Sequence, residues 1–480
     1  MVDCILIYPR PTEDSPKKQP ALSIFFPGAM LEQAGFNVEY IDERFDSQKR
    51  IEELADMAPL SVGVSAMTGF QLLEAKRILT KVKEINPGIK TIMGGVHPSL
   101  LPVKTISEKF VDFVVVGEGE ETLVELISCL RNGEKLGEIG GLLWKENGKI
   151  IENRCRNFIK PEDIPFPLTP KTFPYFKQAA DAGEMIYPTS RGCPHRCGFC
   201  YNLVFNRGKW RPFPLNKWKH EMDCLVKELK FNRMETGDDN IGGNKKRIKQ
   251  IGEIMRRHGI VWDTDIRPEY IDEELIRILD EGGCSTLFMG IESGADRVLR
   301  DIICKDLPNG VENLKKCARL LGKSKIKAIY SFMCNLPTES QEELSQSMAL
   351  ADYIEDHDPK ARISFYVYAP YPGTRLYKVA LEHGFKEPES MEDWSKITLS
   401  NTVNKSAEAL YYISGLRFRG KKGDNTNRNF PGTLRLMILP FELSARMRWA
   451  FRFLSFYSVE KFFVKILFKW ASQRVAHQNI

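Results

Sequence analysis

The sequence lacks any apolar run long enough to cross a membrane, since a spanning helix needs roughly 18 or more apolar residues. Its opening residues, MVDCILIYPRP, lack the basic segment that begins a secretory signal. Its eleven cysteines are scattered except for one cluster, a pattern typical of a reducing compartment rather than of a disulfide framework. We therefore expect a cytoplasmic protein.

Two further features are missing. No G-x-G-x-x-G follows the first predicted strand, so the chain has no dinucleotide-binding fingerprint. The charge is not strongly of one sign, because the net value is only +6 over 480 residues. Hydrophobic content of 42% and charged content of 28% are those of a folded globular protein. This length predicts two or three domains.

The cysteine cluster is the strongest motif in the chain. Cys193, Cys197 and Cys200 lie in RGCPHRCGFCYN with the spacing C-x3-C-x2-C. Iron–sulfur cubanes take four cysteines, so three thiolates would leave one iron open to a substrate or cofactor. Structural zinc would need a fourth ligand such as His195 or Cys224. A disulfide needs an oxidising compartment, and this loop lacks the apolar periodicity of a buried core segment.

This motif, including Phe199 before the last cysteine, resembles the signature of the radical S-adenosylmethionine superfamily. The resemblance implies a 4Fe–4S cluster on the three cysteines, with S-adenosylmethionine on the open iron and Phe199 near its adenine. Reductive cleavage would then give a 5′-deoxyadenosyl radical, which requires an external one-electron reductant. The protein would orient and shield the cofactors that carry the chemistry.

Strands and helices alternate in residues 1–141. Apolar runs predict strands at 4–8, 38–41, 60–65, 91–93 and 113–116. Helical spacing predicts helices at 27–35, 71–85 and 122–130. This order is typical of a doubly wound parallel sheet with a Rossmann-like arrangement. Such sheets bind ligands at the carboxyl ends of their strands.

Glycine-bearing turns follow the later strands of this domain, and they could simply close tight turns. The pattern S-x-M with a later G-G resembles the cobalamin-binding domain that precedes many radical S-adenosylmethionine cores, with Met in place of the usual Leu. No D-x-H-x-x-G follows the first strand, which implies base-off cobalamin without a protein imidazole below cobalt. A corrinoid fold that binds nothing is the alternative. The predicted cobalamin contacts are Ser65, Met67, Gly94, Gly95, His97, Gly117 and Glu118.

Residues 142–182 read as a connector. A hairpin is predicted at 140–153 around Asn147-Gly148, and 161–174 is rich in proline. Residues 183–400 then repeat a strand–helix unit, with strands predicted at 185–189, 231–236, 261–266, 286–291, 325–333 and 363–368. Six such units predict a partial parallel barrel, whose active site lies at the carboxyl ends of its strands.

The order of these units resembles the radical S-adenosylmethionine (β/α)6 barrel over nearly its whole length. Gly237 and Asp238 would stand where that family meets the methionine amino group, although Asp239 and other acids here could merely cap helices. Glu292 in GIESG would contact the ribose, and Tyr371-Pro-Gly-Thr resembles the anaerobic magnesium-protoporphyrin ester cyclase group. The predicted S-adenosylmethionine contacts are Phe199, Gly237, Asp238, Arg267, Glu292, Ser293 and Asn335.

Residues 401–480 form a basic, mostly helical tail. From residue 417 onward the chain has thirteen Lys or Arg and three Asp or Glu, a local balance of +10. Basic and aromatic residues in 441–475 predict either an amphipathic helix at a membrane surface or a helix docked on the barrel. The regular basic stripe does not suggest a nucleic-acid stacking platform. A membrane-binding tail would place the protein at the inner face of the membrane.

The leading hypothesis is a cobalamin-dependent radical enzyme that methylates an unactivated carbon of a hydrophobic or lipid-like substrate. Radical cyclisation or another C–C rearrangement is an alternative within the same class. RNA methylthiolation would need three further cysteines in the first domain, which offers only Cys4 and Cys129. A non-catalytic corrinoid and iron–sulfur scaffold is the alternative from another class.

Overall fold

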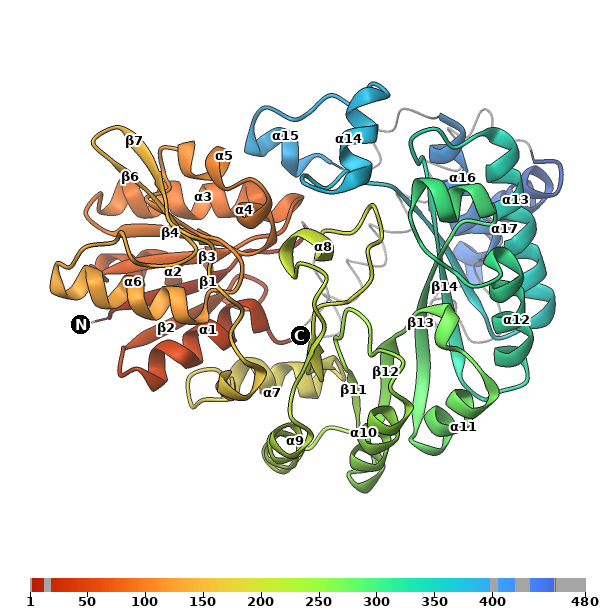
Figure 1. The fold of residues 1–480 in the computed structure, drawn as a ribbon, viewed down its shortest axis with the longest axis horizontal. Coiled ribbons are helices and arrows are strands. Elements are labelled where there is room, and N and C mark those ends of the chain that lie inside the picture. Colours follow the sequence, from red (N-terminus) through yellow and green to blue (C-terminus); the bar gives the residue numbers. More distant parts are fainter. Residues whose placement is uncertain (1, 13–18, 398–404, 419–431, 453, 455–480) are drawn as a thin grey trace.

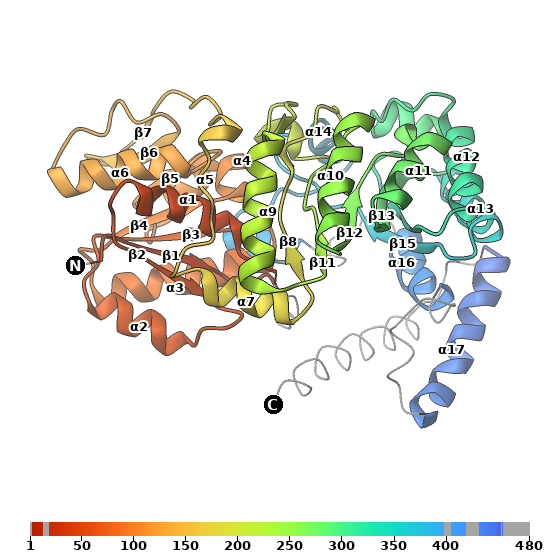
Figure 2. The same ribbon diagram turned by 90° about the horizontal axis from the view of Figure 1, so that it is seen from below.

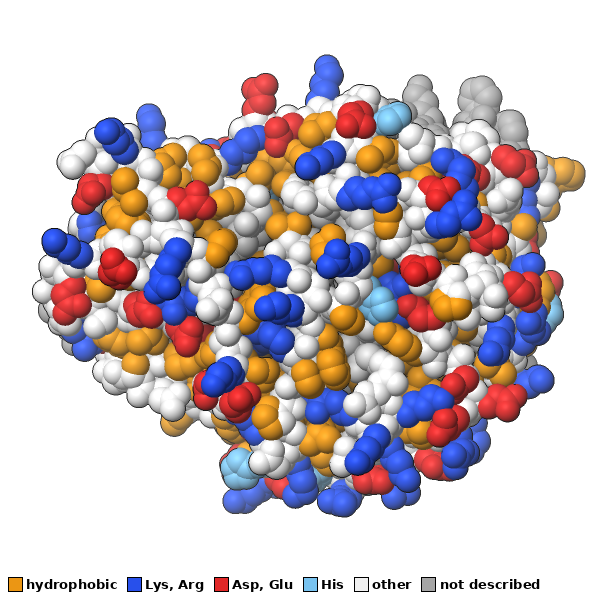
Figure 3. Space-filling model, in the orientation of Figure 1, with side chains coloured by type: hydrophobic (Ala, Val, Ile, Leu, Met, Phe, Trp, Pro, Cys, Tyr) orange, Lys and Arg blue, Asp and Glu red, His pale blue; other side chains and the backbone are white. Residues whose placement is uncertain are grey.

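The computed structural model describes residues 2–12, 19–397, 405–418, 432–452 and 454. Two sheets, each flanked by helices, stand side by side along the longest axis of the molecule (Figure 1). Basic, acidic and apolar side chains are interspersed over the face drawn in Figure 3. The N-terminal sheet and the C-terminal sheet match the predicted doubly wound domain and partial barrel.

The described strands of the first sheet run in the order β2-β1-β3-β4-β5-β6-β7. The first five are parallel, so their carboxyl ends share one edge. The chain crosses from one side of β1 to the other between β2 and β3, which is the point where doubly wound sheets bind ligands. The five strands are β1 (Cys4–Tyr8), β2 (Val38–Asp42), β3 (Ser61–Ser65), β4 (Lys90–Gly94) and β5 (Phe113–Val115).

Helices cover both faces of this sheet because alternate residues of each strand point to opposite sides. In β1, Leu6 packs with α1 (Leu22–Gln33) and α6 (Glu120–Asn132), whereas Ile5 and Ile7 pack with α2 (Gln48–Asp56) and α3 (Phe70–Ile85). Helix α1 begins five residues before the predicted start and contains Pro27. Helix α2 and the short α4 (Val96–Leu100) and α5 (Pro102–Ser107) were not expected from the sequence.

The predicted hairpin belongs to the first sheet rather than to a free connector. Strands β6 (Leu142–Glu146) and β7 (Lys149–Glu152) pair antiparallel with each other, and β6 pairs antiparallel with β5. Leu142, Leu143 and Trp144 are buried there, so the hairpin completes the core at that edge. Helix α7 (Phe173–Asp181) then leads to the second sheet.

The described strands of the second sheet are all parallel and run in the order β15-β14-β13-β12-β11-β8. Helices α9 (Leu215–Leu229), α10 (Lys245–Arg257), α11 (Glu273–Glu281) and α13 (Gln341–His357) match predicted helices, whereas α12 (Gly310–Gly322) was not expected. The strands are β8 (Met185–Ile186), β11 (Arg233–Glu235), β12 (Val261–Asp265), β13 (Cys284–Glu292), β14 (Lys327–Cys334) and β15 (Arg362–Val367).

After β15 the chain returns to the first domain. Helices α14 (Arg375–Glu382) and α15 (Met391–Ser395) lie between the two halves in Figure 1. The Trp394 ring packs against His97, and Lys104 Nζ lies 3.2 Å from a Glu387 carboxylate oxygen. This segment therefore contacts both domains.

The C-terminal helices pack on the far side of the second sheet. Trp449, near the end of α17 (Gly432–Ala450), donates its indole N–H to Asp352 at 2.7 Å and packs on Phe365. Arg417, at the end of α16 (Lys405–Arg417), pairs with Glu355 at 2.7 Å. Figure 2 shows α17 at the end of the molecule opposite the first domain. The docked alternative thus holds for this part of the tail, while residue 453 and residues 455–475 of the predicted 441–475 segment lie outside the described residues.

Among the helices in the described part of the chain, none is both long enough and apolar enough to cross a membrane.

Candidate functional site

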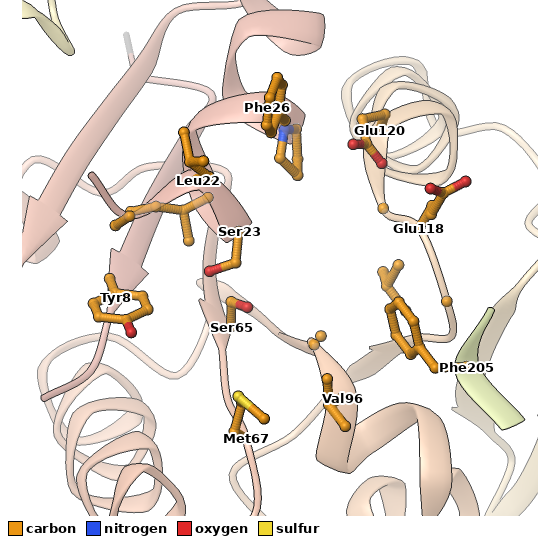
Figure 4. A pocket seen from close by; sticks show the side chains of 18 of the residues that line it. Tyr8, Leu22, Ser23, Phe26, Ser65, Met67, Val96, Glu118, Glu120 and Phe205 are labelled. Atoms are coloured by element: carbon orange, nitrogen blue, oxygen red, sulfur yellow. The ribbon is translucent and has the colours of Figure 1, made fainter. Parts of the chain in front are cut away.

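A cavity of about 440 Å³ lies between the carboxyl edge of the first sheet and the cysteine loop. Figure 4 shows Ser65 and Met67 on one side of it and Glu118, Glu120 and Phe205 on the other. Its size is within the usual range for small-molecule sites. Residues from both domains form its wall, so neither domain could make this cavity alone.

Glycine backbone forms part of the cavity wall that the first domain contributes. Three glycines predicted as cobalamin contacts line the cavity: Gly94 ends β4, Gly95 follows it, and Gly117 lies just beyond β5. Gly95 has φ of 95°, and a Cβ there would come 2.8 Å from the Ala66 amide nitrogen. Gly117 has φ of 80°, and a Cβ there would meet no atom within 4 Å. Only glycine suits both positions, and the bare backbone allows a large planar ring to approach closely, which fits cobalamin.

The remaining predicted contacts of this domain divide into two groups. Ser65 and Met67 line the cavity after β3. His97 is buried, bonds Thr68 Oγ1 through Nδ1 at 2.9 Å and faces the Trp394 ring, and it is absent from the cavity wall. Thr68 and α15 hold the imidazole away from this wall, and a contact between His97 and cobalamin stays a prediction.

Glu118 lines the cavity, but two guanidinium groups hold its carboxylate. Arg191 and Arg211 both donate to it, from the cysteine loop and from β10 (Arg211–Pro212). Burial alone would raise the pKa of Glu118, but the two arginines outweigh it and hold the pKa below its usual value. The sequence predicted Glu118 as a cobalamin contact and did not reveal these partners.

The cysteine loop packs against the second sheet's later loops. Gly198 donates its N–H to the Ile303 carbonyl at 2.6 Å and accepts from the Leu376 N–H at 2.8 Å. A Gly198 Cβ would lie 3.3 Å from that Ile303 carbonyl oxygen, so the loop lies close against this segment. These contacts fix the middle of the C-x3-C-x2-C motif.

The donor chemistry of this loop fits an iron–sulfur cluster. Burial raises the pKa of the Cys200 thiol to about 12, so its thiolate needs a bound cation. His195 instead bonds the Tyr270 hydroxyl through Nε2 at 2.8 Å, which is unfavourable to a zinc site completed by His195. No three His, Cys, Asp or Glu side chains of the described residues converge in a metal-ligating group. To bind a cluster together, the three cysteine side chains of this loop would therefore have to reorient.

Arg267 lies beside the cysteine loop at the end of β12. Its Nη1 donates to the Cys197 sulfur at 3.0 Å, and its Nε donates to Glu269. The guanidinium was expected to meet the methionine carboxylate. In this structure it contacts a predicted cluster ligand instead.

The Asp238 carboxylate accepts hydrogen bonds from other residues of the protein. One carboxylate oxygen accepts from the Thr189 N–H at 3.0 Å, the Ser190 N–H at 2.6 Å and the Ser190 hydroxyl at 2.7 Å, and the other accepts from the Thr189 hydroxyl at 3.0 Å. Burial raises its pKa to about 6. In this structure the carboxyl holds the strand that leads into the cysteine loop, and its contact with the methionine amino group stays a prediction.

Asp239, its neighbour, was expected at the carboxyl end of a strand, with helix capping as the alternative role. It lines the cavity together with Gly237 and accepts the Gly192 N–H at 3.1 Å. Burial raises its pKa above the usual range. The Gly-Asp-Asp motif signalled an acidic group at this position, but only the fold shows which of the two carboxyls reaches the cavity.

The other predicted S-adenosylmethionine contacts sit at the carboxyl ends of the strands but outside the cavity wall. Glu292 ends β13 with φ of 69° and has Lys305 Nζ at 3.3 Å. The Ser293 hydroxyl is hydrogen-bonded to Ser347 Oγ at 3.1 Å. Asn335 follows β14 with φ of 65°, and Phe199 packs on the apolar cluster that extends into the first domain.

Comparison with known proteins agrees with this two-part site. Residues 14–127 match the B12 binding domain, and residues 187–351 match the radical SAM superfamily. An uncharacterized methyltransferase of Pyrococcus horikoshii is 32% identical over 72% of this chain and 74% of its own length. The anaerobic magnesium-protoporphyrin IX monomethyl ester cyclase of Rubrivivax gelatinosus is 25% identical over 68% of this chain and 59% of its own length.

A solved structure shows the same fold. The cobalamin-dependent S-adenosylmethionine radical enzyme OxsB, with aqua-cobalamin and S-adenosylmethionine bound, superposes with a TM-score of 0.73 at 18% identity. The match covers 94% of this chain and 72% of that one. The two domain matches and the methyltransferase relative imply a 4Fe–4S cluster, S-adenosylmethionine and cobalamin as cofactors. This chain is an enzyme of the cobalamin-dependent radical S-adenosylmethionine methyltransferase family.

Proposed function

We propose that this enzyme methylates an unactivated carbon of a hydrophobic small molecule or lipid-like substrate. One observation carries the proposal. The glycines predicted to contact the corrinoid and residues of the cysteine loop line the same cavity: Gly94, Gly95 and Gly117, and Arg191, Gly192 and Tyr201. When bound, the cluster with S-adenosylmethionine supplies a carbon-centred radical and the corrinoid supplies a transferable methyl group. An external one-electron reductant is required.

The division of labour follows the predicted domains. We propose that residues 1–141, completed by the hairpin at 142–152, bind the corrinoid and that the rest of 142–182 connects the domains. Residues 183–400 then hold the cluster and S-adenosylmethionine, and 401–480 are a separate C-terminal region. In the cavity, Leu22, Phe26, Ile186 and Phe205 provide apolar wall. Apolar walls exclude water and suit a hydrophobic reacting group, while Asp239 offers one carboxyl to orient it.

The methyl-transfer experiment uses anaerobic protein loaded with both cofactors, a reductant, deuteromethyl S-adenosylmethionine and a cell lipid extract. The expected product is a lipid that carries one deuterated methyl group, detected by mass spectrometry alongside deoxyadenosine. Deoxyadenosine without any labelled product would contradict methylation. That result would favour radical cyclisation, a second candidate supported by the resemblance to the ester cyclase.

The tail supports a peripheral membrane contact. Leu443, Met447 and Phe451 are 49%, 59% and 81% exposed at helical spacing on and just after α17, and the exposed Arg446 lies beside them in sequence. Such a surface can insert apolar side chains among lipids while arginine meets anionic head groups. All eleven cysteines, each in the described part of the chain, are free, which supports the cytoplasmic side.

Vesicle sedimentation tests this surface. The parent protein should sediment with vesicles containing anionic lipid, and a Met447→Ser, Phe451→Ser variant should remain in the supernatant. Exposed Met57→Ser, Val103→Ser in the first domain serves as the control, because it removes similar apolar area elsewhere. Equal sedimentation of parent and tail variant would contradict membrane contact.

A further inference from the structure

An ion-pair network joins the two domains at the cavity. Arg191 Nη1 donates to Glu118 at 2.9 Å, and Arg191 Nη2 donates to Glu120 at 2.7 Å. Arg211 donates to the Glu118 carboxylate through both terminal nitrogens, at 2.8 and 2.9 Å. Two carboxylates of the first domain therefore face two guanidinium groups of the second, and their charges cancel.

The network is largely buried. The exposed fractions of its side chains are 9% for Glu118, 4% for Glu120, 16% for Arg191 and 12% for Arg211. Bidentate Arg–carboxylate pairs have a fixed geometry as well as a strong attraction. Removing one member would leave a charge buried without its partner, which is much more damaging than losing an exposed pair.

Strand pairing and aromatic rings hold both arginines in place. Arg191 and Arg211 face each other in the antiparallel pair formed by β9 (Ser190–Arg191) and β10. The Arg191 guanidinium lies over the Phe26 ring at 4.9 Å, and that of Arg211 lies over the Phe158 ring at 4.1 Å. Because each guanidinium is stacked as well as paired, the network resists sliding of one domain against the other.

The network connects two particular loops. Glu118 directly follows Gly117, which lines the wall fitted to the corrinoid, and Arg191 is two residues before Cys193. Any shift of the first domain would thus be transmitted to the loop that carries the predicted cluster ligands. Misplacement of about 1 Å between reacting groups can lower a rate roughly a hundredfold.

We propose that Glu118, Glu120, Arg191 and Arg211 are positioning residues that set the spacing and orientation of the corrinoid-binding edge relative to the cysteine loop. The proposal rests on the proposed function. It adds that this ion-pair network keeps the two cofactor sites, which lie on different domains, at a fixed distance and orientation. It replaces the expected role of Glu118 as a direct cobalamin contact.

The test uses Glu118→Gln, Arg211→Gln and the double variant in the full-length chain. Arg417→Gln is the matched control, because Arg417 of α16 and Glu355 of α13 form another part-buried pair, 18% and 19% exposed, and neither residue lines the cavity. In apo protein, amide hydrogen exchange at 113–122 and 189–212 should become at least about tenfold faster in each single variant but not in the control. The double variant should exchange no faster than either single, because it removes both charges of one pair and leaves Arg191 paired with Glu120.

In loaded protein, the readout is the magnetic dipolar interaction between the reduced cluster and cob(II)alamin, measured by electron paramagnetic resonance. Both variants should keep parental iron and corrinoid content, while the distribution of the dipolar interaction broadens or shifts. An unchanged dipolar interaction together with unchanged exchange would overturn the proposal. Loss of corrinoid in Glu118→Gln but not in Arg211→Gln would also overturn it and return Glu118 to the cofactor contacts.

Failure of the proposed function gives a different result. A parent chain that takes up no corrinoid after reconstitution would contradict the proposed function. The exchange measurement on apo protein would still show whether the network couples the two loops.

Discussion

At the carboxyl edge of the first sheet, three of the residues predicted to contact cobalamin are glycines, whereas most residues predicted at the carboxyl edge of the second sheet have polar or charged side chains. The three glycines, Gly94, Gly95 and Gly117, line the cavity. Of the polar residues predicted for the second edge, Asp238 and Ser293 are already hydrogen-bonded within the protein. A glycine needs no partner to present its backbone, but a buried polar side chain must find one, and nearby residues compete with the ligand.

Removing a cysteine should distinguish most clearly between cofactor binding at the first edge and cofactor binding at the second. Cys197→Ala should lose its iron almost completely, because two thiolates from this loop cannot hold the cluster, and S-adenosylmethionine cleavage should be abolished. Corrinoid content should remain at the parental level, since it depends on the other edge. Iron analysis and visible spectra of anaerobically purified protein measure both.

The control is Cys155→Ala, an exposed cysteine in the connector. Loss of corrinoid together with iron in Cys197→Ala would show that the two edges do not bind their cofactors independently.

The complementary substitution is at Gly117, at the carboxyl edge of the first sheet. Gly117→Val puts a β-branched residue at φ of 80° and fills open space at the cavity wall. Corrinoid per chain should fall at least about tenfold, while iron stays at the parental level. Gly133→Val is the matched control, because Gly133 also has positive φ, 70°, and open space around it, at the end of α6. Equal corrinoid loss in both variants would mean that backbone strain alone is responsible.

A buried carboxyl at the second edge predicts a pH effect on stability. Burial raises the pKa of Glu339 to about 8, and its Oε1 atom has no hydrogen-bond partner in the described part of the chain. The folded state therefore binds a proton more tightly than the unfolded state. This stabilisation is complete below about pH 4.5 and is lost as the pH rises through about 8.

Between about pH 5 and pH 8.5, the unfolding free energy of the parent should fall by roughly 2–4 kcal/mol relative to Glu339→Gln. Urea unfolding across this range measures the difference. The exposed neighbour Glu342→Gln should follow the parent. Parallel profiles for the parent and Glu339→Gln would contradict the raised pKa.

The smallest expected effect concerns Arg267. Its hydrogen bond to Cys197 at 3.0 Å places positive charge beside a predicted cluster ligand. Hydrogen bonds to cluster sulfurs raise the reduction potential, so Arg267→Gln should lower it by on the order of tens of millivolts. Potentiometric titration measures this shift. Arg233→Gln, at the start of β11, removes the same charge far from the loop and should leave the potential unchanged.

Much of the architecture was predictable because hydrophobic periodicity is a local property. The five parallel strands of the first sheet and the six of the second were predicted close to their observed places. Helix α2 was missed although Ile51, Leu54 and Ala55 are buried at helical spacing, since charged residues dominate that short segment. The hairpin at 142–152 was predicted, but its pairing with β5 involves residues distant in the sequence.

Residue type and short-range spacing were enough to predict the two domains, the cysteine motif and the glycine turns. The packing of distant segments places Asp239 rather than Asp238 at the cavity, holds His97 away from it, and pairs Glu118 with Arg191 and Arg211. The physical reason is the same in each case. A buried polar group bonds to whichever partner the packing of distant segments brings within about 3 Å.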